Sequence, residues 1–460
     1  MHWDCPDNRA TNVTGFTALP GGLRRPYFAH LGQRAYFWDG SYGKFILYCT
    51  NGVVGHINSM NNYGLSVRCV KDKEFGISFA ASGSSAAVSL VKVENPSSGA
   101  SLTLNGDQTL YLGHGTAPAG TVKMEYSAGQ NLKYTGISGN YSTVVVDKPT
   151  RSKTITFNFI PCTDADNNNY PVVEIGEYTW MAENLKTTKY KDGTPVPNIT
   201  INVDTPDSWM YSSEGYCWYN NDPGYKDIYG GLYKLNSLKS GKLCCAGWHA
   251  PNNAEWGYLT DFLEGKLVAG GKLKETGTAH WANPNTGATN ESGFTALPGG
   301  SRNYGGEFHG LGLTGMFWSI SNCDGPGGCG WAIHFTSEGI SWVDWDTQGF
   351  SVRCVYGEDP MIPELETDYF VDQNITGTVA ESGGTYVKDH GLPITQKGVC
   401  WSTSILPTIS DPHTSDGSGP DSFISVMTGL TPGTKYYVRA YATNSAGTGY
   451  GMSIPFTTNY

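Results

Sequence analysis

Short apolar runs separated by turn residues dominate the chain and predict many β-strands and few helices. Between residues 73 and 160 the runs SLVKVENP, SLTLNG, QTLYLG, KMEY, STVVVD and KTITFNFI alternate or run apolar between turns. This pattern predicts a β-sandwich of seven or so strands. A different spacing is found at 252–263, where Trp256, Leu259, Phe262 and Leu263 recur at helical intervals. Asn252 or Asn253 is a suitable N-cap, so we expect a short amphipathic helix there.

The chain contains an internal repeat. ATNVTGFTALPGG at 10–22 recurs as ATNESGFTALPGG at 288–300, and YGLSVRCV at 63–70 recurs as QGFSVRCV at 348–355. His2-Trp3 likewise matches His280-Trp281, and Phe37-Trp38 matches Phe317-Trp318. The chain therefore holds two copies of one module.

The repeated blocks form a frame around stretches that change. Segments 23–62 and 301–347 share little sequence and differ in length. A scaffold that displays a binding surface on loops gives this pattern, and so does drift in exposed loops without a ligand. The frame residues Phe294, Leu297, Trp318, Phe350 and Val352 should be buried in both cases, because cores tolerate little change in volume.

The order of the blocks predicts four domains. The second copy has an upstream part, starting near residue 162, that the first copy lacks. We therefore expect the C-terminal half of a module at 1–72, a β-sandwich at 73–160 and a complete module at 161–357. At 358–460, Leu430 to Tyr436 precede YYVRAYAT, which resembles the tyrosine corner of fibronectin type III domains. Because the chain starts inside a module, we expect a piece of a longer polypeptide or a subunit completed by a neighbour.

Several ordered blocks carry a family resemblance. WMAENL, CWYNND, the string GKLC…GWHAP…EW, GFTALPGG and GFSVRCV together resemble the Fibrobacter succinogenes major paralogous domain. That family occurs in many copies in surface proteins of Bacteroidetes and their relatives. The resemblance covers 162–357 fully and 1–72 as a C-terminal half.

A second, more distant resemblance is to the C-type-lectin-like fold. Trp248 to Pro251, followed by Glu255-Trp256, resembles the Pro…Glu-Trp helix of formylglycine-generating-type proteins, and GFSVRC resembles the last core strand of that fold. Variable proteins diversified by retroelements are similar, and they display a randomised patch just before this strand. The resemblances imply a mostly β protein with some α+β, in which lectin-like modules with a short helix and small antiparallel sheets alternate with β-sandwich domains.

The divergent stretches supply the candidate ligand-binding residues, which are aromatic or polar. In the second copy they are Tyr304, His309, Trp331, His334, Trp342 and Asp344, and in the first copy Tyr27, His30, Tyr48, His56 and Asn58. The opposite interpretation is that many of these rings fill the core. In WVDW, strand alternation puts Trp342 and Asp344 on one face and Val343 and Trp345 on the other.

Composition and charge exclude several classes of protein. The formal net charge of −11 disfavours a nucleic-acid partner. No apolar run reaches the ~20 residues that span a bilayer, and the start MHWDCPDN lacks the pattern of a signal peptide. Neither a three-histidine iron site, a G-x-S-x-G elbow nor a P-loop is found, so we expect no catalytic residues.

The chain has 11 cysteines and no C-x-x-C pair with zinc-site spacing, which favours disulfides in an oxidising compartment. The odd count leaves at least one unpaired. The disulfide candidates are Cys162, Cys217, Cys244, Cys245, Cys323, Cys329 and Cys354. Cys323 and Cys329 flank a Gly-rich loop that a local disulfide would close. Cys217, Cys244 and Cys354 match cysteines of the family blocks, and at least one disulfide should join members of this set, or one of them to Cys162 or Cys245.

A calcium site is the weaker of two interpretations of CTDADNNNY. Asp164, Asp166 and Asn168 alternate as at the start of a calcium loop. The sixth position is Asn169 instead of Gly, and an Asx-rich turn explains the same residues. We therefore expect no cofactor and no resident metal.

Two functions follow from the sequence. The first is an extracellular or cell-surface protein whose lectin-like modules bind a glycan or protein ligand. The second is a structural subunit that assembles with copies of itself into an extracellular fibre or surface layer. The divergent stretches favour the first function, and the incomplete first module favours the second.

Overall fold

A computed structural model of the 460-residue chain divides it into two units, residues 1–73 and 74–460. The structure describes residues 74–460 except 83–86, 115, 128, 202–207, 322–328, 345–347, 359–360 and 369–374. Before residue 74 it describes five strands only.

The strands of the first unit follow the pattern of the second module copy. They are β1 Leu23–Arg24, β2 Phe28–Ala29, β3 Arg34–Trp38, β4 Lys44–Tyr48 and β5 Val54–Ile57. Strands β1 and β2 pair antiparallel, and β3, β4 and β5 form an antiparallel sheet. In the second copy, β21 Thr314–Trp318, β22 Cys329–His334 and β23 Ile340–Asp344 form an equivalent sheet. The repeated Phe-Trp pair occupies the last two positions of both β3 and β21.

Residues 75–157 form the sandwich that the strand pattern predicts. One sheet contains β10 Thr121–Met124, β9 Thr109–Leu112, β6 Phe75–Ala81 and β13 Lys153–Phe157 in that order. The facing strands are β8 Ala100–Asn105, β7 Leu90–Asn95, β11 Leu132–Ser138 and β12 Tyr141–Asp147. Side chains such as Ile77, Leu110, Tyr134 and Phe157 are fully buried between the sheets.

The second sheet of the sandwich continues into the following module. Strand β12 pairs in parallel with β14 Val172–Ile175, through Thr143 with Val172 and Val144 with Val173. From there the sheet runs through β15 Tyr178–Met181 and β25 Val355–Tyr356 to β18 Trp248–His249. Lys133 Nζ also donates to Thr295 Oγ1 at 3.2 Å across this junction. Sandwich and module therefore share one eight-stranded sheet, which the sequence pattern did not predict.

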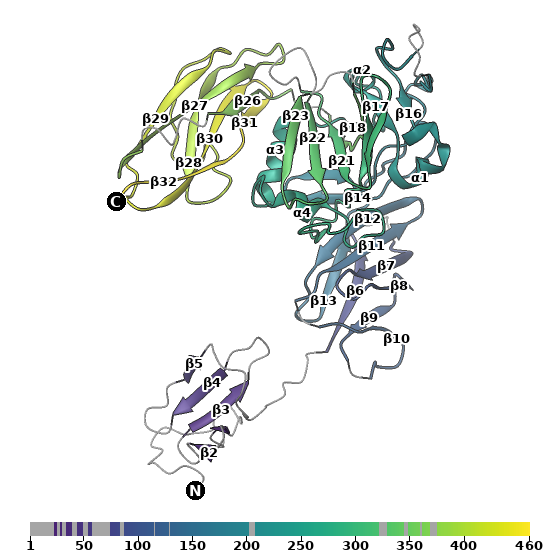
Figure 1. The fold of residues 1–460 in the computed structure, drawn as a ribbon, viewed down its shortest axis with the longest axis vertical. Coiled ribbons are helices and arrows are strands. Elements are labelled where there is room, and N and C mark those ends of the chain that lie inside the picture. The colour runs from purple at the N-terminus through teal and green to yellow at the C-terminus, as the bar shows by residue number, and fades with distance from the viewer. Residues whose placement is uncertain are drawn as a thin grey trace. The chain divides into compact units, whose positions relative to one another are not determined.

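The central module adds a sheet of its own and a helix (Figure 1). Its strand order is β16 Tyr216–Cys217, β17 Leu232–Lys234, β24 Gly349–Phe350, β19 Gly299–Arg302, β21, β22 and β23, and β20 Phe308–Leu311 pairs with β19. The short helices α1 Lys226–Tyr229, α2 Leu235–Lys239 and α4 Ala269–Leu273 lie in its loops.

The predicted helix is α3 Asn253–Phe262, which Asn252 caps. Asn252 Oδ1 accepts the N–H of Glu255 at 2.9 Å, and the Glu255 carboxylate accepts the N–H of Asn252 at 3.0 Å, which completes a capping box. Trp256 and Leu259 are fully buried, as their spacing predicts. Phe262 is 47% exposed, so its expected place on the buried face of the helix was wrong.

The GFSVRC segment lies at the centre of the module. Phe350 is in β24 between β17 and β19, whereas Val355 pairs with β15 in the other sheet. Phe350, Val352 and Cys354 are all fully buried. The segment is therefore central as expected, but only Gly349–Phe350 of it forms a strand, and β25, which follows directly, belongs to the other sheet.

Residues 364–457 form a second sandwich. One sheet has the order β26 Glu364–Thr367, β27 Val379–Lys388 and β29 Phe423–Thr428. The other contains β28 Gln396–Ser402, β30 Lys435–Asn444, β31 Gly447–Tyr450 and β32 Ile454–Thr457. The hydroxyl of Tyr436 accepts the N–H of Thr431 at 3.2 Å, the contact expected of a tyrosine corner.

Within the part of the chain that the structure describes, no helix has the length and apolar character needed to cross a bilayer.

Candidate binding surfaces of the central module

The frame residues lie beneath the divergent stretch. Phe294, Trp318, Phe350 and Val352 are fully buried in the module, as the repeat predicts. Leu297 differs, because it is only partly buried and lines a small cavity of 260 Å³. Most of the repeated positions are thus shared because they pack, whereas the stretch between them reaches the surface.

Two of the candidate ligand-binding residues lie on the hairpin formed by β19 and β20. Tyr304, in the turn, is 47% exposed, and His309 in β20 is exposed. The Asn303 side chain orders this turn by accepting the Glu307 N–H at 2.9 Å, and its amide nitrogen lies 3.0 Å from His309 Nε2. The hairpin therefore presents an aromatic ring and an imidazole whose position is set by neighbouring polar groups.

His334 lies at the end of β22, opposite Thr314, the first residue of β21 after the hairpin. It is exposed, its ring packs on Phe335, and Nδ1 lies 2.8 Å from Thr336 Oγ1. His334 is thus displayed as proposed, on a strand that follows the hairpin and not on the hairpin itself.

Trp331 is a core residue, which corrects its assignment as a ligand-binding residue. It is 2% exposed, its ring stacks on Trp256 at 5.8 Å, and Nε1 donates to Asn253 Oδ1 at 3.2 Å. Its partners in the adjacent strands are Phe317 and Trp342, which share its face of the sheet. Because Trp256 of α3 stacks on Trp331, the helix covers this face at Trp331. The interpretation that these rings fill the core holds here.

Trp342 is 38% exposed but does not lie on the hairpin surface. It lines a cavity of 300 Å³ with Tyr450, Met452 and Ile454 of the C-terminal sandwich. Its neighbour Val343 packs against the core cluster on the opposite face of the sheet, as the alternation in WVDW predicts. Asp344 ends β23, and its side chain lies outside the described residues.

The candidates of the first copy have little structural description. Tyr27, His30 and Asn58 lie outside the described residues. Tyr48 ends β4 and His56 lies in β5, and the side chains of both are outside the description as well.

The cysteines of the module fall into two groups. Cys244 and Cys354 form a disulfide that links the GKLC and GFSVRC blocks. Cys329 is disulfide-bonded, and Cys323 lies outside the described residues. The described cysteines that carry free thiols are all buried, and they are Cys162, Cys217, Cys245 and Cys400.

The CTDADNNNY segment forms an Asx turn. The carboxylate of Asp164 accepts the N–H groups of Asp166 and Asn168, both at 2.9 Å, and the hydroxyl of Tyr170. Asp166 accepts the backbone N–H of Thr188 and, at 2.8 Å, its hydroxyl; burial raises the pKa of Asp166, but these hydrogen bonds and Lys189 lower it overall. The two carboxylates are therefore engaged in ordering the chain.

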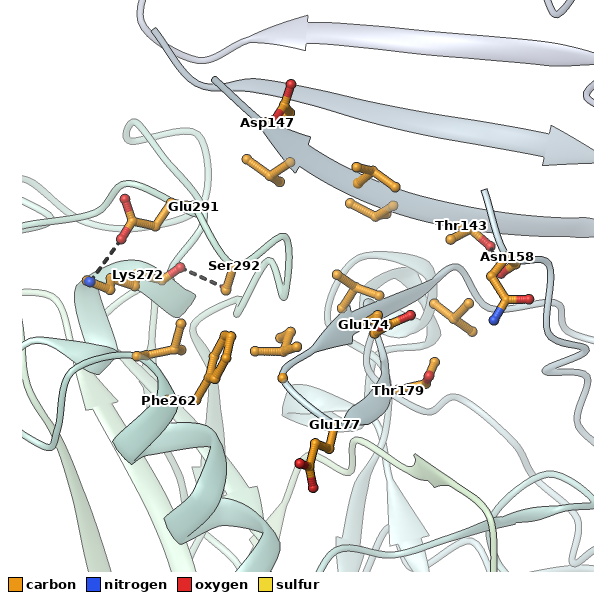
Figure 2. Close-up of a pocket in the computed structure, with 18 of the residues that line it drawn as sticks. Thr143, Asp147, Asn158, Glu174, Glu177, Thr179, Phe262, Lys272, Glu291 and Ser292 are labelled. Atoms are coloured by element: carbon orange, nitrogen blue, oxygen red, sulfur yellow. Dashed lines mark hydrogen bonds and ion pairs between the residues drawn. The ribbon is translucent and has the colours of Figure 1, made fainter. Parts of the chain in front are cut away.

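A larger groove opens where the sandwich meets the module (Figure 2). Its volume is 950 Å³, and it is bordered by β12, β14, the C-terminal end of α3 and the segments around Lys272 and Glu291. Gly176, with φ of 64°, turns β14 into β15 so tightly against Tyr258 that a Cβ would lie 2.6 Å from its ring. Sequence reasoning missed this groove, because its walls come from strands whose pairing is not visible in the sequence.

Comparison with known proteins identifies the module. The fold defines a modular, mostly β protein in which a mixed central module lies between two sandwiches. Residues 173–356 match the family model described as the Fibrobacter succinogenes major domain, the family that the sequence blocks of this module resemble. No curated protein matches the chain.

Similar solved structures are β-sandwiches. One is a redesigned β-sandwich protein, with 25% identity and a TM-score of 0.16 over 21% of this chain and 90% of that chain. Another is the fibronectin type III domain of human fibronectin type III domain containing protein 3, with 19% identity and a TM-score of 0.15 over 21% and 84%. A third is chicken CNTN1 FN1–FN3, with 14% identity and a TM-score of 0.17 over 29% and 40%.

Proposed function

We propose that this chain is an extracellular binding protein whose central module recognises a glycan or protein ligand through the β19–β20 hairpin. One observation carries the proposal: the two copies share a sequence frame whose residues are mostly buried in the second copy, and the stretch that differs between the copies supplies the exposed Tyr304 and His309. Residues freed from packing can change with the ligand, whereas the frame cannot.

The chemistry of the hairpin suits recognition better than catalysis. A tyrosine ring offers a large contact area at a small entropic cost, and its hydroxyl adds a polar end. His309, with Asn303 and Glu307 beside it, can donate or accept hydrogen bonds from a sugar hydroxyl or a peptide group. The Cys244–Cys354 disulfide supports an oxidising, extracellular location.

The test compares the full chain with a Tyr304→Ala/His309→Ala variant on a glycan array and in binding assays with surface proteins of neighbouring cells. The double variant should lose binding of any ligand found, or its affinity should fall at least about tenfold. Tyr211→Ala is the matched control, because Tyr211 is a 54% exposed tyrosine of the same module outside the divergent stretch. Equal binding by all three proteins would refute the hairpin as the recognition surface.

Assembly into a fibre remains the second candidate, and one observation favours it. Strand β8 is the last strand of the shared sheet, and within the described residues it pairs only with β7. Such an edge can pair with another chain. Filaments of purified protein under the electron microscope, lost in a Thr103→Pro variant that still folds, would establish this function instead.

A further inference from the structure

We propose that the groove of Figure 2 is a second binding site, which accepts an extended, basic peptide segment of another protein as an added strand. This site is separate from the β19–β20 hairpin, so the inference goes beyond the function proposed above.

The backbone of the groove carries the first part of the argument. The ladder between β12 and β14 covers only two residue pairs, ending at Val144 and Val173. Strand β12 runs on to Asp147 with β11 on its other side, and β14 runs on to Ile175 with β15 on its other side. Beyond the ladder, the facing edges of both strands therefore border the groove. Strand edges present N–H and C=O groups to which an extended peptide can add.

The side chains beside these edges suit alternating residues of a strand. The partly buried Val145 and Val146 line the groove, and the exposed ring of Phe262 adds an apolar wall (Figure 2). Successive residues of a strand point to opposite faces, so every second side chain of an added strand can contact this wall. A volume of 950 Å³ leaves room for more than one residue of such a segment.

Charge decides which peptide fits. The lining contains five carboxylates, of Asp147, Glu174, Glu177, Glu264 and Glu291, against two ammonium groups, of Lys148 and Lys272.

Both lysines are already paired. Lys272 Nζ lies 2.9 Å from Glu264 and 3.0 Å from Glu291, and Lys148 Nζ lies 3.6 Å from Glu291. Glu174 and Glu177 are exposed, and among the described residues neither has an ion pair within 4.0 Å. An occupant with lysine or arginine side chains complements these two carboxylates, whereas an acidic peptide is repelled.

The experiment uses the full chain and a short acetylated, amidated, fluorescently labelled peptide of alternating lysine and valine. Binding is followed by fluorescence anisotropy at low and at moderate salt. We expect saturable binding that weakens with salt, and that weakens at least about tenfold in a Glu174→Lys/Glu177→Lys variant. The control variant Asp107→Lys/Asp421→Lys changes the net charge equally at exposed sites in the two sandwiches and should bind as the native chain does.

A second peptide separates strand addition from attraction by charge alone. The same sequence with N-methyl groups on alternate residues keeps every charge and side chain but loses the N–H donors along one edge of the strand, so its affinity should fall at least about tenfold. Equal binding of both peptides, equal loss in both charge variants, or no binding of the unmethylated peptide would each overturn the proposal. Tyr304→Ala/His309→Ala should leave peptide binding unchanged, so failure of one site is distinguishable from failure of the other.

Discussion

Nη1 of Arg353 donates a hydrogen bond to the carbonyl oxygen of Phe294 at 2.6 Å, which joins the GFSVRC block to the GFTALPGG block. The same guanidinium donates to Asn184 Oδ1 at 2.6 Å and to the carbonyl oxygens of Met181 and Thr295 at 3.0 and 2.8 Å. Burial lowers the pKa of Arg353 to about 9. One wholly buried cation thus holds together three blocks that identify the module.

Replacing Arg353 with methionine should destabilise the central module by about 3 kcal/mol or more. The substitution keeps apolar bulk but leaves buried carbonyl oxygens and an amide without a donor. Urea unfolding followed by the fluorescence of the buried tryptophans measures the loss. Arg151→Met, at an exposed arginine, should change the midpoint little, and an equally small effect at Arg353 would contradict the role assigned to it.

Stability of the junction between α3 and the C-terminal sandwich should depend on Asp261. Its carboxylate accepts the N–H of Ser453 at 2.7 Å, and burial raises its pKa from 3.8 to about 7, although Arg439 and this N–H oppose the shift. The folded state holds the proton more tightly than the unfolded state does. Protonated Asp261 therefore makes its full contribution to the free energy of unfolding below pH 4. This contribution falls by about 1.4 kcal/mol per pH unit as the pH rises towards 7, and it changes no further above pH 7.

Asp261→Asn keeps an oxygen for the Ser453 N–H and removes the ionisation. Between about pH 5 and 8, a range that brackets the raised pKa of Asp261, we expect the urea midpoint of the variant to vary less than that of the native chain. The exposed control Asp421→Asn should preserve the native dependence. Parallel curves for the native chain and Asp261→Asn would exclude Asp261 as the source.

A further disulfide should form between Cys162 and Cys245 during oxidative folding. Their Sγ atoms lie 3.6 Å apart, and the two side chains are only 1% and 2% exposed. Burial raises the pKa of the Cys162 thiol, which makes it inert once folded, so the bond must form earlier. Oxidised glutathione accepts the two electrons, and two molecules of reduced glutathione are released.

Mass spectrometry of unreduced peptides should find Cys162 linked to the peptide that contains Cys244 and Cys245, with Cys217 and Cys400 still alkylated. The cross-link should stabilise the chain by roughly 2–4 kcal/mol over a Cys162→Ala variant. Full alkylation of Cys162 and Cys245 after refolding in the oxidised mixture would rule the bond out.

Trp342→Ala should loosen the contact between the module and the C-terminal sandwich without affecting a ligand of the hairpin. Trp342, Met452 and Ile454 line the same cavity between the two domains, so truncation of the indole enlarges this cavity, at a cost of about 1–2 kcal/mol. Hydrogen exchange of β26 should become faster in this variant and stay native in Tyr304→Ala. If Trp342→Ala lost the ligand that the hairpin binds, Trp342 would instead belong to the recognition surface.

Local patterns in the sequence predicted much of this protein. Alternating apolar runs predicted most strands of the first sandwich, Asn252 and the spacing of Trp256 and Leu259 predicted α3, and the repeated blocks predicted the buried frame. The family assignment of 173–356 followed from blocks that can be found by inspection. These features depend on residues close together in the chain or on direct repetition, so no knowledge of distant contacts was needed.

Features that depend on contacts between distant segments were not predictable in the same way. Alternation placed Trp342 and Val343 on opposite faces correctly, but it could not show that α3 covers the face on which Trp331 lies. The exposure of Phe262 has a similar cause, because helical spacing defines a stripe but not how far the neighbouring elements extend over it. For these side chains, burial was decided by elements folded from other parts of the chain.

The sequence by itself determined the strand and helix pattern, the module frame and its family, and the chemical types available in the divergent stretch. Only the tertiary structure decided that the sandwich and the module share a sheet, that the Figure 2 groove opens where β12 and β14 separate, and that Arg353 joins three distant blocks. The physical reason is that periodicity reports which side chains share a face, whereas strand pairing and burial are set by backbone contacts between residues far apart in sequence.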